Sequence, residues 1–219
     1  MPRPSRDPSR VVVTAGPTRE PLDDVRALTN LSTGRMGIEL ARVAHRRGAR
    51  VTLLLGPTHL EPPAGVATVR VETTRDLLRA ARTAVRDADL VLFAAAPADW
   101  RPARRVRGKL SKDGSGLAVT IRLVENPDVA ATLGRTKGRR VHVGFALEVA
   151  GGLANARRKL TRKRFDAIVL NGPENVGRGG GKAWFVAPGA PPVALPTGDK
   201  RATARAILDL VALLPARRA

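Results

Sequence analysis

The sequence predicts an α/β fold of the Rossmann-like, doubly wound type, with a mostly parallel sheet. Short apolar runs at residues 11–15, 51–55 and 89–95 have the composition of buried strands. Between them, residues 34–47 and 74–87 carry apolar side chains at helical spacing. This alternation of strands and helices implies parallel strands joined by right-handed crossovers. We also expect a flexible flap and a small hairpin extension on this fold.

Turn-forming residues set the ends of the predicted elements. The strands at 11–15 and 51–55 each run into a Gly-Pro pair, and Gly48 is a stop signal for the first helix. The helix at 74–87 has Thr73 or Thr74 as its cap. The remaining elements are strands at 66–71, 117–124, 141–146 and 166–170, helices at 126–133, 152–164 and 197–214, and a hairpin of 183–186 with 193–195.

Two segments lack any periodic pattern. Residues 97–116 are rich in Arg, Pro, Gly, Lys and Ser, and long irregular segments in compact domains are often functional, so we interpret them as the flap. Residues 1–10 hold Pro, Ser and Arg without an apolar stretch, which indicates a disordered basic tail and not a signal peptide. We expect residues 11–215 to form one domain.

Composition narrows the class of protein. A hydrophobic fraction of 43% in 219 residues supports a packed core, and no apolar run is long enough to cross a bilayer. The absence of Cys excludes disulfides and thiolate metal sites. We therefore expect a cytoplasmic protein without a membrane partner.

The net charge of +20 has two interpretations. The 39 Lys and Arg include seven Lys, which leaves 32 Arg, so the excess is an arginine bias spread along the chain. A basic surface can bind nucleic acid, but such proteins usually add stacking aromatic residues, which are only 3% here. We favour a solvated surface over a nucleic-acid partner. A basic site for a phosphorylated substrate fits the charge equally well.

Two segments are placed where a ligand could bind. Gly16 to Glu20 follows the first strand, whose end opens onto the ligand crevice in doubly wound folds, although an ordinary turn fits as well. Ser32, Thr33 and Gly34 enter the first helix, where backbone N–H groups and hydroxyls can bind an anion. A plain cap needs one such residue, so the cluster favours a site.

The few lysines stand out in a chain that uses Arg almost everywhere. Lys159 and Lys163 share one helix face, where like charges repel slightly unless a polyphosphate binds. Their spacing alone favours a solvated face over a phosphate site. His45, His59 and His142 lack metal-ligand spacing, and the segment 177–182 is better interpreted as a hairpin loop than as a P-loop.

Five motifs in order resemble the phosphopantothenoylcysteine synthetase family over nearly the whole chain. Each motif alone is weakly specific, and their ordered sum is strongly specific. They are Thr-Ala-Gly-Pro-Thr-Arg-Glu at 14–20, Val-Arg-x-x-x-Asn-x-Ser-x-Gly-x-Met-Gly at 25–37, Ala-Ala-x-x-Ala-Asp-Trp-Arg at 94–101, Asn-Pro-Asp at 126–128 with Val-Gly-Phe-Ala at 143–146, and Lys-Leu-x-x-Lys-x-x-Asp at 159–166.

The resemblance implies a two-step ligase reaction in coenzyme A biosynthesis. The carboxylate of 4'-phosphopantothenate attacks the α-phosphate of CTP and gives an acyl-CMP and pyrophosphate; the amine of cysteine then displaces CMP. Such an enzyme must neutralise phosphate charge and hold the reactants in line, and Mg²⁺ normally assists. The resemblance also implies a homodimer, in a stand-alone form whose flavin-dependent decarboxylase is a separate polypeptide.

Carried over residue by residue, the resemblance makes Asn30 and Lys109 catalytic, with Asn30 tied to turnover of the acyl-nucleotide. It turns Lys159 and Lys163 into phosphate-binding lysines, and Lys200 also matches a family lysine. The implied nucleotide-binding positions are Phe93, Ala94, Ala95, Asp99, Lys109, Asn126, Pro127, Asp128, Val129, Phe145, Lys159 and Lys163, and the implied phosphate or substrate loop is Gly16, Thr18, Arg26, Ser32, Thr33 and Gly34. The metal ligands stay unassigned.

Several positions depart from the family pattern, so the choice between CTP and ATP stays open. They are Pro97, Ser111, Leu147, Val149 and Gly172. Two other functions are alternatives. A non-catalytic nucleotide-binding paralogue is disfavoured because the two catalytic positions are occupied as in the family. A nucleic-acid-associated basic protein would show a steep salt dependence of DNA binding.

Overall fold

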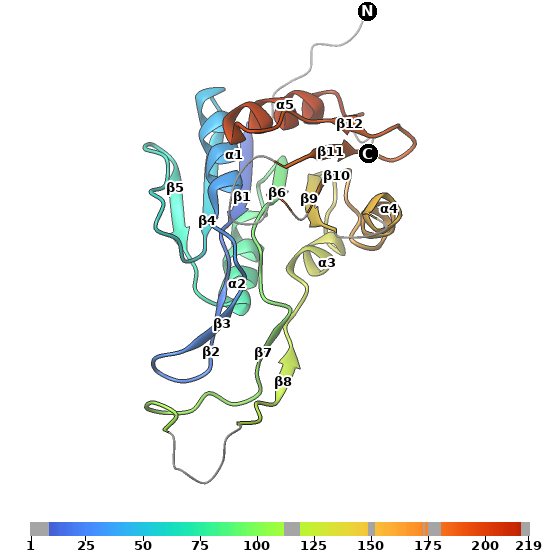
Figure 1. The fold of residues 1–219 in the computed structure, drawn as a ribbon. Helices are drawn as coiled ribbons and strands as arrows, with labels where there is room; N and C mark the ends of the chain where they lie inside the picture. The colour runs from blue at the N-terminus through green and yellow to red at the C-terminus, as the bar shows by residue number, and fades with distance from the viewer. Residues whose placement is uncertain (1–8, 112–118, 149–151, 173, 175–180, 216–219) are drawn as a thin grey trace, which may run out of the picture.

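A computed structural model of the chain describes residues 9–111, 119–148, 152–172, 174 and 181–215. Its centre is an eight-stranded sheet in the order β12-β11-β10-β9-β6-β1-β4-β5, with helices on both faces (Figure 1). The strands are β1 Arg10–Ala15, β4 Arg50–Leu55, β5 Ala67–Arg70, β6 Leu90–Phe93, β9 Val141–Leu147, β10 Ala167–Asn171, β11 Ala183–Val186 and β12 Val193–Ala194. The helices are α1 Arg35–Arg46, α2 Thr74–Ala84, α3 Val129–Gly134, α4 Gly152–Arg162 and α5 Lys200–Ala212.

The central strands are apolar along their whole length because both faces of the sheet are covered. In β1, Val11 and Val13 belong to the core that includes α1 and α5, whereas Val12 belongs to the core that includes α2, α3 and α4. Successive side chains of a strand point to opposite faces, so one short run serves two cores. This confirms the predicted buried strands and the α/β class.

The strand order reverses between β1 and β6. From β1 the chain continues outward through β4 and β5, whereas β6, β9 and β10 extend the sheet on the other side, all in parallel. The carboxyl ends of β1 and β6 therefore form the topological switch point, where doubly wound sheets bind ligands. Beyond it, β10, β11 and β12 pair antiparallel, which confirms the predicted hairpin.

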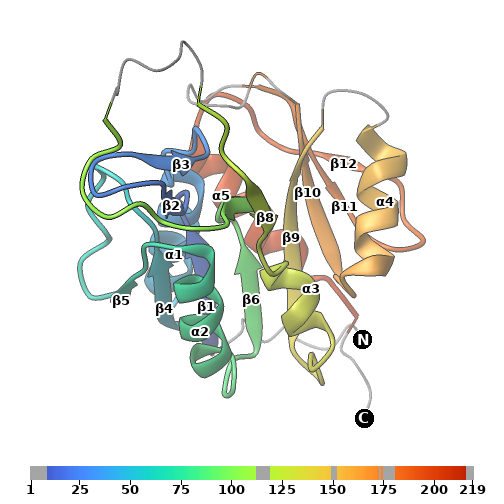
Figure 2. The ribbon, with the colours of Figure 1, turned by 90° about the horizontal axis from the view of Figure 1, so that it is seen from below.

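Two short antiparallel pairs project from this end of the sheet and were not predicted. β2 Arg19–Pro21 pairs with β3 Ala27–Thr29, and β7 Trp100–Pro102 pairs with β8 Leu123–Glu125. In Figures 1 and 2 both pairs lie beside each other on the same side of the sheet. The expected strand at 117–124 is thus reduced to β8, and part of the expected irregular flap is β7.

The remaining differences lie at the ends of elements. Thr73, and not Thr74, caps α2 in a reciprocal capping box with Asp76, and α2 ends at Ala84. Residues 1–8 of the predicted disordered tail, Lys112, Val149 and most of the loop at 177–182 lie outside the described residues. The tail was predicted to reach residue 10, but Arg10 begins β1, and its amide and the Ser9 hydroxyl donate to the carboxylate of Asp89. Among the helices described, none has the length and apolar character needed to span a membrane.

Candidate active site

A cavity of about 830 Å³ lies at the switch point and is bordered by α3 and α4. The topology gathers there residues from motifs that are far apart in the sequence. Ten of the predicted nucleotide-binding residues line it: Phe93, Ala95, Asp99, Asn126, Pro127, Asp128, Val129, Phe145, Lys159 and Lys163. Ala94 and Lys109 are not among the lining residues.

Aromatic side chains form the apolar part of the cavity. Phe93 packs edge-on against the buried His142, with ring centroids 5.2 Å apart, and lies 5.6 Å from the ring of Phe165. Gly144 of β9 makes room for this cluster, since a Cβ atom there would lie 2.2 Å from the Phe165 ring. The packing accounts for His142 as a structural residue, as its spacing predicted.

Hydrogen bonds from buried side chains fix the loop after β6 at Ala98. The amide of Ala98 donates to the hydroxyl of Thr18 at 2.9 Å, and the carbonyl of Ala98 accepts from the side chain of Asn126 at 2.9 Å. The Thr18 hydroxyl also contacts the hydroxyl of Thr74 at 2.9 Å. Thr18 and Asn126 are buried. Their polar groups are engaged by protein partners, so these two residues shape the cavity by fixing the loop at Ala98 and Asp99.

Both predicted phosphate-binding lysines form ion pairs with carboxylates. Lys159 Nζ lies 2.6 Å from Glu148 Oε1, and Lys163 Nζ lies 3.0 Å from Asp128 Oδ2. Burial alone would raise the pKa of Glu148, but hydrogen bonds from Lys159 and Asn155 outweigh it and lower that pKa. The pKa of Asp128 is lowered in the same way, against burial, by the Ala131 amide and by Lys163. Both carboxylates are therefore charged at neutral pH.

Three glycines bring the loops of the switch point into close contact. A Cβ atom on Gly34 would lie 3.2 Å from backbone atoms of Gly16, and one on Gly56 would lie 1.8 Å from the carbonyl oxygen of Pro17. Gly34 has a φ of 78° and caps α1 without a side-chain hydrogen bond. Ser32 and Thr33 hydroxyls instead accept from the amides two residues further on, at 3.3 and 3.4 Å. The first amide of α1, that of Arg35, therefore bonds to Thr33, while the N-cap residue itself supplies no side-chain hydrogen bond.

Asn30 connects this loop to the cavity wall. Its side-chain amide donates to the carbonyl oxygens of Ala96 at 3.2 Å and of Pro97 at 3.0 Å. Pro97 lines the cavity, and Ala96 forms a parallel bridge with Pro17. Asn30 therefore lies next to the cavity and orients the loop that forms its edge.

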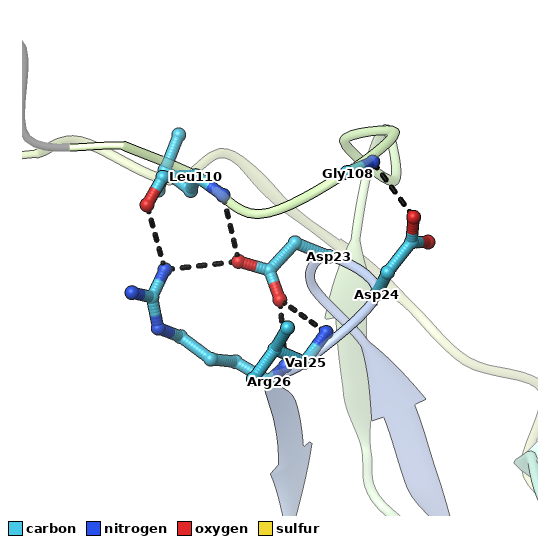
Figure 3. A network of polar contacts seen from close by, with 6 residues as sticks. All are labelled: Asp23, Asp24, Val25, Arg26, Gly108 and Leu110. Atoms are coloured by element: carbon cyan, nitrogen blue, oxygen red, sulfur yellow. Dashed lines mark hydrogen bonds and ion pairs between the residues drawn. The ribbon is translucent and has the colours of Figure 1, made fainter.

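Arg26 lies in the turn between β2 and β3, Lys109 lies in the flap beside it, and neither lines the cavity. The guanidinium of Arg26 donates to the carboxylate of Asp23 at 2.9 Å and to the carbonyl oxygen of Leu110 at 3.1 Å (Figure 3). Lys109 is exposed. Within one chain, the structure thus joins Arg26 to the flap and does not bring Lys109 to the nucleotide cavity.

Some residues of the site were missed by sequence reasoning. Glu148 was not predicted, because its ion pair with Lys159 depends on the distance between the end of β9 and α4 in space. Lys137, which lies outside the cavity lining, is buried and pairs with Asp166, while its Nζ donates to the carbonyl oxygen of Arg164 at 2.8 Å. The scarcity of lysine in an arginine-rich chain was the signal that the sequence offered for Lys137.

A metal ion fits this site only together with phosphates. Among the described residues, no group of three or more His, Cys, Asp and Glu could hold a metal. Mg²⁺ in nucleotide enzymes is commonly bound by one or two carboxylates together with substrate phosphates and water. Asp99 and Asp128 line the cavity and could supply such carboxylates.

Known proteins with similar sequences identify the family of this chain. Residues 7–214 match the family model DFP, described as the DNA/pantothenate metabolism flavoprotein C-terminal domain. The chain belongs to this family. The Coenzyme A biosynthesis bifunctional protein CoaBC of Vibrio vulnificus is 39% identical over 180 residues, which are 82% of this chain and 45% of that protein. The CoaBC protein of Mycobacterium bovis is 40% identical over 219 residues, which cover 92% of this chain and 51% of that protein.

A solved structure extends the DFP relationship to the fold. The crystal structure of the C-terminal domain of CoaBC is 33% identical, with a TM-score of 0.81, and the match covers 96% of this chain and 97% of that one. The chain spans about half the length of the curated relatives that it matches. Family membership confirms the resemblance that the five motifs indicated.

Proposed function

We propose that this DFP domain is a phosphopantothenate–cysteine ligase of coenzyme A biosynthesis, with CTP as the activating nucleotide. The observation that carries the proposal is the cavity at the switch point, which gathers ten of the predicted nucleotide-binding positions from within or next to three of the five sequence motifs. The relatives, whose names assign them to coenzyme A biosynthesis, support the same pathway.

The two lysines of the cavity provide the charge for a triphosphate. Lys159 and Lys163 are partly exposed and are each paired with a carboxylate from another element. A bound polyphosphate would replace Glu148 and Asp128 as the partner of these lysines. The carboxylates thus hold the lysines extended toward the cavity before substrate arrives, which lowers the entropy lost on binding.

The reaction proceeds by two displacements. A carboxylate oxygen of 4'-phosphopantothenate bonds to the α-phosphorus as pyrophosphate leaves, and the amine of cysteine then attacks the acyl carbon as CMP leaves and a proton is released. Lys109 neutralises charge on the phosphates in the first transition state. Asp99 or Asp128, together with the phosphates, would hold Mg²⁺, which would supply further charge neutralisation.

Asn30 acts in the second displacement. Its two N–H groups are bonded to the carbonyl oxygens of Ala96 and Pro97. One of these donors can transfer to the acyl oxygen, whose negative charge grows as the amine attacks. Loss of one such donor typically lowers the rate by about a hundred- to a thousandfold. Asn30→Ala should therefore still form acyl-CMP and accumulate it in the presence of cysteine.

A homodimer completes the proposal. Large apolar side chains are exposed on and beside the projecting strands, where a second copy could cover them. They include Val25, Leu28, Leu31, Trp100, Val119, Ile121 and Leu123. Lys109 lies on the same projection, so a two-fold partner would bring it toward a cavity that its own chain leaves without it. Sedimentation that gives only monomer at micromolar concentration would contradict the dimer.

The function is tested by pyrophosphate release with 4'-phosphopantothenate, cysteine and each nucleoside triphosphate in turn. We expect release that requires phosphopantothenate and is fastest with CTP. Lys163→Gln is the site variant, and Arg158→Gln, on the same helix and outside the cavity lining, is its matched control. Release that is independent of phosphopantothenate, or equal in both variants, would contradict the proposal.

A further inference from the structure

We propose that Asp23 is a positioning residue that fixes the flap root, residues 105–111, and thereby sets the position of Lys109. This inference rests on the proposed function, because it takes Lys109 to be catalytic. We call the contact between the β2–β3 turn and the flap root the flap clamp. It consists of Leu22, Asp23, Asp24 and Arg26 from the turn, and of Arg105, Val106, Gly108 and Leu110 from the flap.

The carboxylate of Asp23 is the centre of the flap clamp (Figure 3). Its Oδ1 accepts from the amides of Val25 at 2.7 Å and of Arg26 at 2.6 Å. Its Oδ2 accepts from the Arg26 guanidinium at 2.9 Å and from the Leu110 amide at 3.0 Å. The side chain of Asp23 is 0% exposed. Each oxygen thus receives two donors, which a neutral amide at this position could not accept.

The flap is joined to the turn at every second residue. The amide of Val106 donates to the carbonyl of Leu22 at 2.9 Å, and that of Gly108 donates to the carboxylate of Asp24 at 2.7 Å. The amide of Leu110 donates to Asp23. Lys109 therefore lies between two residues whose amides are both held by carboxylates of the turn, while it is itself exposed.

The protonation state of Asp23 agrees with this role. Burial of the side chain raises the pKa of Asp23, but hydrogen bonds from the amides of Leu110, Val25 and Arg26, together with the Arg26 charge, lower it to about 2. The clamp is thus charged at any pH at which the enzyme works. Arg26 was predicted to belong to the substrate loop, but within the clamp its guanidinium donates to Asp23 and to the carbonyl oxygen of Leu110.

The flap clamp and the nucleotide cavity are built from different residues, since no clamp residue lines the cavity. The clamp therefore fixes the backbone on both sides of Lys109 without contributing to nucleotide binding. Loss of the clamp should leave nucleotide binding unchanged and slow the chemical step, because a displacement of about 1 Å in a catalytic group can lower a rate by about a hundredfold.

The test compares Asp23→Asn with Asp24→Asn, which removes the ion pair with Arg105 and weakens the hydrogen bond from the Gly108 amide but keeps Asp23. The matched control is Asp209→Asn, which removes a surface ion pair between α1 and α5. In Asp23→Asn we expect amide exchange in residues 105–111 to rise at least about tenfold, kcat to fall about tenfold or more, and KM for CTP to stay within about twofold. Asp24→Asn should show the same pattern more weakly, and Asp209→Asn should match the wild type.

A double variant with Lys109→Gln tests whether Asp23 acts through Lys109. We expect Asp23→Asn to lower kcat no further in a Lys109→Gln background. The inference is overturned if amide exchange in residues 105–111 is unchanged, if only KM for CTP rises, or if the losses in kcat of the two substitutions multiply. If Asp23→Asn does not fold, the same measurements on Asp24→Asn test the flap clamp. A Lys109→Gln enzyme with full activity would instead reject the proposed role of Lys109, while the exchange result would still report on the clamp.

Discussion

The contact between Gly56 and Pro17 offers a strict test of how the site is built. Gly56 follows β4 and has no Cβ, and a Cβ placed there would lie 1.8 Å from the carbonyl oxygen of Pro17. Such atoms essentially never approach within 3.0 Å, so Gly56→Ala must separate the two loops by about 1.2 Å. The neighbouring atoms are backbone, and a flexible side chain cannot absorb the shift.

The displacement reaches the site through a short series of contacts. Pro17 forms a parallel bridge with Ala96, and the carbonyl of Ala96 accepts from Asn30. Misplacement of about 1 Å can cost about a hundredfold in rate, which is about 2.7 kcal/mol in the barrier. We therefore expect Gly56→Ala to lower kcat/KM about a hundredfold, with a loss of about 1–3 kcal/mol in the free energy of unfolding from overpacking.

Pyrophosphate release under conditions where the variant is fully folded separates the two effects, and urea unfolding measures the second. Gly152→Ala is the matched control. Its new Cβ would meet its nearest neighbours at 3.5 Å, an ordinary contact. We expect its activity and stability to stay close to those of the wild type. Activity of Gly56→Ala within about threefold of the wild type would refute the idea that this glycine contact positions the site.

Three further predictions follow from charged groups. Lys137→Met leaves Asp166 without its buried partner, and urea unfolding should show a loss of about 3–5 kcal/mol. Steady-state kinetics should show that Lys109→Gln chiefly lowers kcat, whereas Lys163→Gln chiefly raises KM for CTP; the reverse would exchange their roles. The pKa of Asp23 is lowered from 3.8 to about 2, so its stabilisation is complete above about pH 4 and is lost as pH falls toward 2. Protection of the amides at residues 105–111, relative to unstructured amides at the same pH, should therefore fall across this window, and unchanged protection would contradict the assignment.

The sheet could be predicted from sequence because its strands are long, apolar and separated by turn signals. β1 and β4 end at Gly-Pro pairs, and α1 carries its apolar residues on one side. The short strands β2, β3 and β7 could not be predicted. Each has three residues, and their pairing depends on partners far along the chain, as β7 with β8 demonstrates. No local period marks such a strand.

The site was predictable as a set of residues but not as a set of contacts. The resemblance named ten of the residues that line the cavity, and they meet because the carboxyl ends of parallel strands lie together at the switch point. They did not reveal that Thr18 and Asn126 hold the loop from below, or that Lys159 is paired with Glu148. Arg26 was expected in the substrate loop, yet its partner Leu110 is 84 residues away in sequence. Such contacts depend on tertiary structure and leave no pattern in a single sequence.

The most direct test of the proposed reaction follows an oxygen atom. If the carboxylate of 4'-phosphopantothenate attacks the α-phosphate of CTP, one of its oxygens must leave with CMP when cysteine displaces the nucleotide. We propose a reaction with phosphopantothenate labelled with oxygen-18 in the carboxylate, followed by mass spectrometry of all products. The account predicts one labelled oxygen in CMP and none in pyrophosphate. Unlabelled CMP, or label in inorganic phosphate, would contradict it.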